Sequence, residues 1–193
     1  MSNQDTLAPS SSGIRPLSER DLRKNRFGMS LYCISQAVPY FLLINIRFVI
    51  AGNFVPVGLN LWLGGILPTL ALLIGILPLF TARAALQKND IPRVRSHIMT
   101  SLLLGIIGFL SLLIPLWFHN FDALSPFGEI DLISLGVACF YTLIALIVVW
   151  GVYLRLGKGL IQKETGWGLE GAIWTYVFNA LAWTALFVIL DLL

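Results

Sequence analysis

Apolar stretches recur along the chain from Phe27 onward, and short polar segments separate them. The five stretches cover residues 27–50, 59–82, 98–118, 132–154 and 172–190. Each is close to the roughly 20 residues that an α-helix needs to cross the hydrocarbon core of a bilayer. The pattern therefore predicts an all-α fold, a bundle of five transmembrane helices over residues 27–193. Residues 1–26 are polar and are predicted to form a tail outside the membrane.

Charged residues gather between the apolar stretches, and their signs predict an orientation. All of the 13 Lys and Arg residues except Arg47 fall in the tail, between the second and third stretches, or between the fourth and fifth. The opposite loops hold Asp122, Glu129 and Asp131 but no basic residue. Because basic loops stay on the cytoplasmic side, we predict a cytoplasmic N-terminus and a C-terminus outside.

Composition supports a membrane protein and argues against other classes. Hydrophobic residues make up 57% of the chain and charged residues 12%, about half of the charged fraction of a soluble domain. The net charge of +3 is explained by basic residues that flank the apolar stretches, so we expect no nucleic-acid partner. Cys33 and Cys139 lie within apolar stretches and are expected to pack as free thiols.

Residues that could carry catalysis are few. His97 and His119 lie at opposite ends of the third stretch, on the order of 33 Å apart at about 1.5 Å per residue, so they cannot share a metal or a haem within one chain. No carboxylate is predicted deep in a span, which argues against an autonomous proton pump or ion-coupled transporter. No histidine is placed to activate a Ser, Thr or Cys nucleophile. We therefore expect no catalytic, metal-binding or cofactor-binding residue in this chain.

Polar side chains recur on one face of the first stretch and on one face of the last. Those of the first fall within about 40° of one another at 100° per residue, and those of the last are three and four residues apart. The six residues are Gln36, Tyr40 and Arg47 in the first stretch and Tyr176, Asn179 and Trp183 in the last. They are predicted to contact lipid headgroups or a partner subunit, and hydrogen bonding between helices of this chain is the alternative. Arg47, the one basic residue expected on the outer side, is a candidate to reach a lipid phosphate or an acidic group.

Several sequence motifs follow one another in an informative order. The first stretch opens with Phe-Gly-Met-Ser-Leu-Tyr at 27–32 and continues with Ser-Gln at 35–36 and Arg47. A basic loop and the run Thr-Ser-Leu-Leu-Leu-Gly follow within 83–105, and the last stretch holds Trp-Thr-Tyr-Val-Phe-Asn-Ala-Leu-Ala-Trp at 174–183. In this order the motifs resemble subunit III of the haem-copper (cytochrome c and quinol) oxidases, from the third helix of that family to its last.

The resemblance covers about residues 20–193 and matches a short five-helix form without the family's first two helices. The chain departs from the family where functional side chains are usual. The departures are Gln36 in place of a glutamate, residues near Ala138 and Tyr141 and then Tyr176 or Val177 in place of histidines, and Asn179 or Ala180 in place of an aspartate. A role tied to those carboxylates, such as proton delivery, is therefore not carried over, and the chain resembles a divergent member retained for assembly.

The resemblance implies a non-catalytic subunit of a respiratory terminal oxidase in a bacterial plasma membrane. Such a subunit would stabilise subunit I, which would carry the haems and copper, would contact the other subunits, and would bind membrane lipids. It would belong to an oxidoreductase complex without catalytic residues of its own. Two alternatives stay open: an accessory subunit of nitric-oxide reductase or of another electron-transfer complex, and a small transporter or channel that works as an oligomer.

Overall fold

The computed structural model describes residues 18–52, 59, 61–119, 121–162 and 166–192, and nearly all of these lie in helices. The five α-helices are α1 (Glu19–Ile50), α2 (Leu67–Gln87), α3 (Ile91–Trp117), α4 (Pro126–Gly157) and α5 (Trp167–Phe187). Two π-helical turns adjoin them, η1 (Trp62–Ile66) before α2 and η3 (Val188–Leu192) after α5. No strand occurs among the described residues, and the all-α prediction is confirmed.

Each α-helix, together with its π-turn where it has one, is long and apolar enough to cross a membrane. The five segments have 26 to 32 residues. At about 1.5 Å per residue, each is longer than the roughly 30 Å of bilayer hydrocarbon. The prediction of five membrane-spanning helices is confirmed in this sense, and the chain has the architecture of an integral membrane protein.

Helices α1, α3 and α4 begin well before the apolar stretches that predicted them, because the side chains of Ser18, Asp90 and Ser125 cap them in polar sequence. Ser18 accepts a hydrogen bond from the Asp21 amide at 3.2 Å, and α1 therefore begins at Glu19 rather than near residue 27. Ser125 accepts from the Gly128 amide at 3.1 Å at the start of α4. Such caps satisfy amides that have no partner in the first turn.

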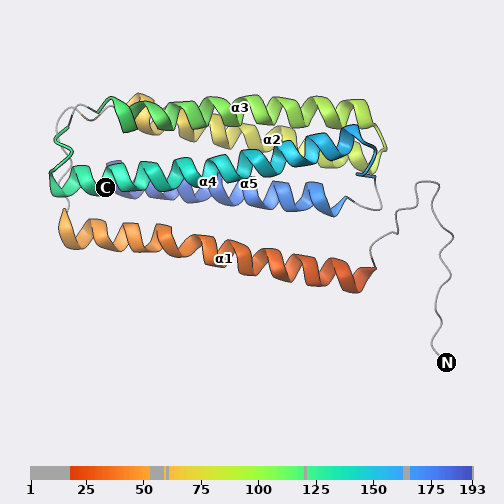
Figure 1. Ribbon diagram of the computed structural model, residues 1–193, viewed down its shortest axis with the longest axis horizontal. Helices are drawn as coiled ribbons and strands as arrows, with labels where there is room; N and C mark the ends of the chain where they lie inside the picture. Colours follow the sequence, from red (N-terminus) through yellow and green to blue (C-terminus); the bar gives the residue numbers. More distant parts are fainter. Residues whose placement is uncertain (1–17, 53–58, 60, 120, 163–165, 193) are drawn as a thin grey trace.

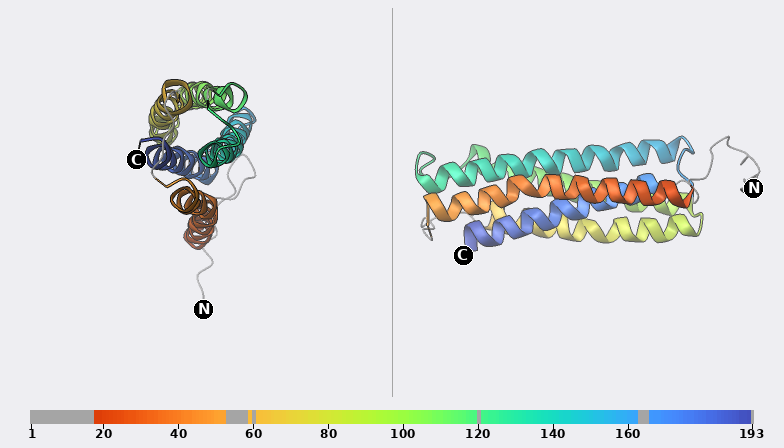
Figure 2. Two further views of the ribbon diagram at one scale, coloured as in Figure 1. Left: turned by 90° about the vertical axis from the view of Figure 1, so that its left-hand side faces the viewer. Right: turned by 90° about the horizontal axis from the view of Figure 1, so that it is seen from below.

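Helices α2 to α5 form a four-helix bundle, and α1 lies outside it. Viewed along the helix axes in Figure 2, α2 to α5 form a ring, and α1 packs against the side made by α4 and α5. In Figure 1, α1 begins at the same end of the bundle as the α2–α3 and α4–α5 connections. We call this the basic end, because it carries Arg26, Arg83, Arg95 and Arg155. The chain finishes with η3 at the opposite end.

Glycine allows the bundle helices to approach closely at its centre. The Tyr176 hydroxyl of α5 lies between Gly75 of α2 and Gly105 of α3, and a Cβ atom on Gly75 would overlap it. Ser101 of α3 donates a hydrogen bond to the Gly75 carbonyl oxygen at 2.7 Å. Small residues are common at such contacts because packing has to supply attraction that lipid does not. The Tyr176 ring and the Leu146 side chain thus fill the middle of the bundle.

Helix α1 buries a narrow stripe. Its buried residues are Tyr40, Leu43 and Arg47, spaced three and four apart as on one helix face. From Phe27 onward, large apolar side chains cover most of the rest of its surface, and Val49 is 84% exposed. The apolar surface of α1 therefore faces the lipid or another protein, and its attachment to the bundle depends on a few contacts.

Candidate functional site

A line of polar contacts joins α1 to the bundle, and we call it the polar seam. It has three levels along the helix axis. Tyr40 and Asn179 define the middle level, Arg47 the level at the end opposite the basic end, and Arg26 with Glu170 the level at the basic end. The seam thus contains members of both polar stripes identified in the sequence.

The middle level is a short chain of hydrogen bonds across three helices. The Tyr40 hydroxyl of α1 donates to Asn179 Oδ1 of α5 at 3.3 Å, and Asn179 Nδ2 donates to Thr142 Oγ1 of α4 at 2.9 Å. The Tyr40 ring also packs against Tyr141 and Phe178, with centroids 5.7 and 6.4 Å away. Bilayer hydrocarbon offers no hydrogen-bond partners, so polar groups at this depth stabilise the bundle by bonding to one another.

Arg47 forms the level opposite the basic end and is only 1% exposed. Its Nε and Nη2 atoms each donate to the Leu190 carbonyl oxygen at 3.4 Å, and Nη1 donates to the Gly52 carbonyl oxygen. The guanidinium carbon lies 5.1 Å from the centroid of the Phe127 ring, and the charge also interacts with Asp191. A buried charge needs such compensation. Arg47 therefore fastens the end of α1 to the last turn of the chain.

A small cavity beside Arg47 contains a cluster of titratable side chains. It has a volume of about 30 Å³, and its polar lining comes from His119, Asp131 and Asp191. Among the described residues, His119 Nδ1 and Asp191 Oδ1 are buried without a hydrogen-bond partner. The two carboxylates interact electrostatically with each other. The volume suits about one water molecule, and these polar atoms would bind it.

Asp131 lies elsewhere than the sequence indicated. The sequence placed it in a loop, whereas the structure places it in the second turn of α4 and buries it to 7% exposure. The reason is the Ser125 cap, which starts the helix at Pro126. No three His, Cys, Asp or Glu side chains in the described part of the chain are grouped so as to hold a metal ion.

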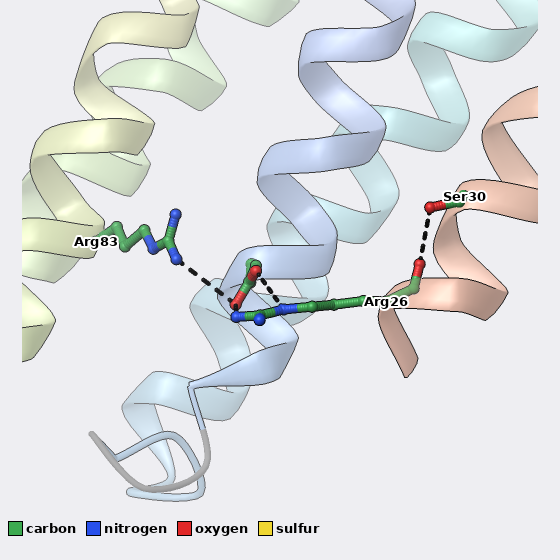
Figure 3. Close-up of polar contacts among 4 residues, drawn as sticks. Arg26, Ser30 and Arg83 are labelled. Carbon is green, nitrogen blue, oxygen red and sulfur yellow. Dashed lines mark hydrogen bonds and ion pairs between the residues drawn. The ribbon is translucent and has the colours of Figure 1, made fainter. Parts of the chain in front are cut away.

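The level at the basic end is an ion-pair bridge across three helices. Glu170, in the first turn of α5, accepts from Arg26 Nε of α1 at 3.2 Å and lies 3.7 Å from Arg83 Nη2 of α2. Figure 3 shows Arg26 and Arg83 reaching toward this carboxylate from opposite sides. Ser30 donates to the Arg26 carbonyl oxygen one turn along α1. A carboxylate in the first turn of a helix is also favoured by the helix dipole.

The remaining members of the predicted stripes differ in their surroundings. Tyr176 and Trp183 are buried, and Tyr176 points to the bundle centre rather than to α1. The Trp183 ring stacks on Phe187 with centroids 6.3 Å apart. Gln36 is half-buried, and its buried Oε1 has no hydrogen-bond partner among the described residues.

Three of the six stripe residues, Tyr40, Arg47 and Asn179, form hydrogen bonds to other helices or turns of the chain. Tyr176 and Trp183 are buried, but the Tyr176 hydroxyl and Trp183 Nε1, like Gln36 Oε1, have no hydrogen-bond partner among the described residues. Contact of the six residues with lipid or with another subunit stays a prediction.

Three residues of the site escaped the sequence analysis. Thr142 of α4 and Glu170 of α5 lie in helices that carry apolar residues on every face, because both helices pack against several neighbours. Their sequences therefore show no polar face that would single out these two residues. The signal for Glu170 was present: it is an acidic residue close to a helix start, between two basic segments. Asp191 follows the last apolar stretch of the sequence by one residue, and the structure places it in η3 against the cavity.

The fold and the seam define the class of this protein: a five-helix integral membrane protein in which a peripheral helix is fastened to a four-helix bundle by buried polar contacts. Neither the protein-family models nor the curated protein sequences contain a match to the chain.

Proposed function

We propose that the chain is a non-catalytic, subunit III-like component of a respiratory terminal oxidase. In this role it stabilises subunit I, which carries the haems and copper, contacts other subunits of the complex, and binds membrane lipids. The order of motifs in residues 20–193 supports the proposal, as does the number of membrane-spanning helices. We also propose a bacterial plasma membrane as its location, with the basic end in the cytoplasm.

The observation that carries a scaffold role is the filled centre of the bundle. Tyr176 occupies the space between Gly75 and Gly105, with Leu146 beside it. A transporter or channel needs a path through the protein or between copies of it, and polar side chains usually line that path. Here Tyr40, Asn179 and Thr142 bond to one another between helices instead. These contacts favour a scaffold protein, which holds helices in place, over a transporter or channel, which needs a path for its solute.

The outer surface of α1 fits association with other membrane proteins. Its exposed side chains are almost entirely apolar between Phe27 and Ile50, and the helix has the bundle on one side only. A partner subunit would cover this surface by close packing, which drives helix association in membranes. The proposal assigns that place to subunit I or to another subunit of the complex.

Purification in mild detergent tests the proposal. A tagged full-length chain isolated from membranes of its native host is expected to co-migrate with a haem-bearing subunit that reduces oxygen. A haem-bearing complex that reduces nitric oxide and not oxygen would replace the terminal oxidase with a nitric-oxide reductase. A homogeneous, colourless oligomer of the chain with solute flux in liposomes would overturn the proposal in favour of a transporter or channel.

A further inference from the structure

A recess adjoins the basic-end level of the polar seam and lies between α1, α2 and α5. It has a volume of about 410 Å³, within the size range of ligand pockets. Its walls are apolar and include Cys33 of α1, Phe80 of α2, and Ile173, Trp174 and Phe178 of α5. The three α5 residues follow Glu170 at steps of three, four and eight along the helix, so the recess runs about 12 Å along α5 at about 1.5 Å per residue.

A second, polar hollow continues this recess toward the basic end. It has a volume of about 170 Å³ and shares Arg83 and Glu170 with the apolar recess. Arg26, Gln87 and Trp167 also line it. The two hollows together form one cleft with an apolar part toward the membrane interior and a polar part toward the surface, and we call it the α1–α5 cleft. This division into an apolar and a polar part matches the apolar tail and polar headgroup of an amphiphile.

The charges at the junction of the two hollows favour an anion. The side chains of Arg26 and Arg83 are 52% and 43% exposed, whereas that of Glu170 is 15% exposed. Two cations therefore meet one carboxylate, and the net charge is positive. Arg83 lies 3.7 Å from Glu170 but donates no hydrogen bond to any described residue. Its guanidinium keeps donors for a phosphate, which arginine binds in a bidentate manner.

The depth of Arg83 agrees with a lipid phosphate. Arg83 lies four residues before the end of α2 at Gln87, about 6 Å along the helix at about 1.5 Å per residue. This places its guanidinium, together with that of Arg26 (Figure 3), at the edge of the apolar segment rather than inside it. The recess beyond Phe80 is then at the level of acyl chains.

We propose that the α1–α5 cleft binds one anionic membrane phospholipid, with its phosphate against Arg83 and Arg26 and an acyl chain along α5. The proposal deepens the lipid-binding part of the proposed function and rests on it, but it requires no particular catalytic partner. A neutral amphiphile would occupy the apolar recess equally well and would leave the excess positive charge uncompensated.

Native mass spectrometry of the purified full-length chain tests the site. The chain is exchanged into micelles that contain equal amounts of phosphatidylglycerol and phosphatidylcholine, and the lipid that stays bound is weighed. One phosphatidylglycerol is expected on the unmodified chain. Arg83→Gln should reduce its retention about tenfold, because a charged hydrogen bond is lost. Arg93→Gln is the matched control, since Arg93 lies at the start of α3, outside the cleft, and its side chain is 67% exposed.

A second pair of variants tests the apolar part without changing charge. Val177→Trp should fill the recess, which Val177 lines, and displace the lipid. Leu181→Trp, one turn further along α5 on an exposed position, should leave retention unchanged. Equal retention of both lipids by the unmodified chain would overturn the proposal, as would equal retention by the Arg83 and Arg93 variants. Co-migration with a haem-bearing subunit is scored separately, so a failure of this site is distinguishable from a failure of the proposed function.

Discussion

Arg47 shows how a charged residue is accommodated inside this bundle. Its guanidinium contacts carbonyl oxygens of Leu190 and Gly52, the Phe127 ring and the charge of Asp191. The sequence suggested that this arginine could pair with an acidic group. In the structure the acidic group is Asp191. Arg47 also donates to backbone carbonyl oxygens, and the pattern of side chains in the sequence does not predict these partners.

Removal of the Arg47 charge is expected to destabilise the protein. Arg47→Met should lower the free energy of unfolding by about 3 kcal/mol, because the buried carbonyls and Asp191 lose their partner. Arg47→Lys should recover part of this loss, since lysine keeps the charge without the planar fork. Unfolding by added SDS in mixed micelles, followed by circular dichroism, measures the change. Arg155→Met, at an exposed position of the basic end, is the control. Equal stability of the two Met variants would show that Arg47 does not fasten α1.

The Tyr40–Asn179 hydrogen bond is testable by a double-mutant cycle. Tyr40→Phe and Asn179→Leu should show a coupling energy of about 1 kcal/mol, in the range found for hydrogen bonds between membrane helices. The same unfolding titration measures it. The control cycle combines Asn179→Leu with Tyr141→Phe, since Tyr141 packs against Tyr40 without bonding to Asn179. Additive effects in the first cycle would exclude a contribution of this bond to stability.

Periodicity predicted the face of each polar residue but not its partner. Tyr40 and Arg47 were placed on one face of α1, and the structure buries that face. The partner of Tyr40 is Asn179, which is 139 positions away in sequence, and a single sequence contains no signal for such a pairing. Thr142 was missed for the same reason, because a threonine in an apolar helix has no distinctive pattern until its neighbour is known.

At the scale of helices, the contact between α2 and α5 depends on the absence of one side chain. Gly75→Ala should destabilise the bundle by about 2 kcal/mol, since the added methyl group would overlap the Tyr176 hydroxyl. That hydroxyl lies near Ser101, whose own proton is donated to the Gly75 carbonyl oxygen, and it makes no hydrogen bond of good geometry to the described residues. Tyr176→Phe should therefore cost little alone and should restore stability to the Gly75→Ala variant.

Thermal unfolding of the single and double variants measures this rescue. Gly136→Ala is the matched control, because nothing lies within 4 Å of the added Cβ, and alanine raises helix propensity by about 1 kcal/mol. It should be neutral or stabilising. Absence of rescue by Tyr176→Phe would mean that another contact, such as that of the helix backbones, limits the approach of α2 and α5.

Helix existence followed from the sequence, whereas helix ends and helix partners did not. Hydropathy detects the segment that sits in hydrocarbon, and it stopped short of the polar first turns that Ser18 and Ser125 cap. Hydropathy also does not indicate which of the five helices lies outside the bundle. The exclusion of α1 from the ring of α2 to α5 depends on side-chain fit, such as Tyr176 against Gly75 and Gly105.

At the scale of the whole molecule, the two ends of the bundle differ in charge. The basic end carries Arg26, Arg83, Arg95 and Arg155. At the other end, Arg47 is buried, interacts with the charge of Asp191 and donates to the backbone carbonyl oxygens of Leu190 and Gly52. Its charge is compensated within the protein and does not compete with the basic end. This difference in charge between the two ends predicts that the basic end stays in the cytoplasm.

Cysteine labelling in intact cells tests the resulting orientation. In a background with Cys33→Ala and Cys139→Ala, Leu124→Cys and Lys158→Cys each provide one exposed thiol, at opposite ends of the bundle. A membrane-impermeant maleimide should label position 124 in intact cells and position 158 only after permeabilisation, since basic loops remain in the cytoplasm. The reverse pattern would place the Arg26–Glu170–Arg83 bridge outside. The lipid of the α1–α5 cleft would then have to come from the outer leaflet.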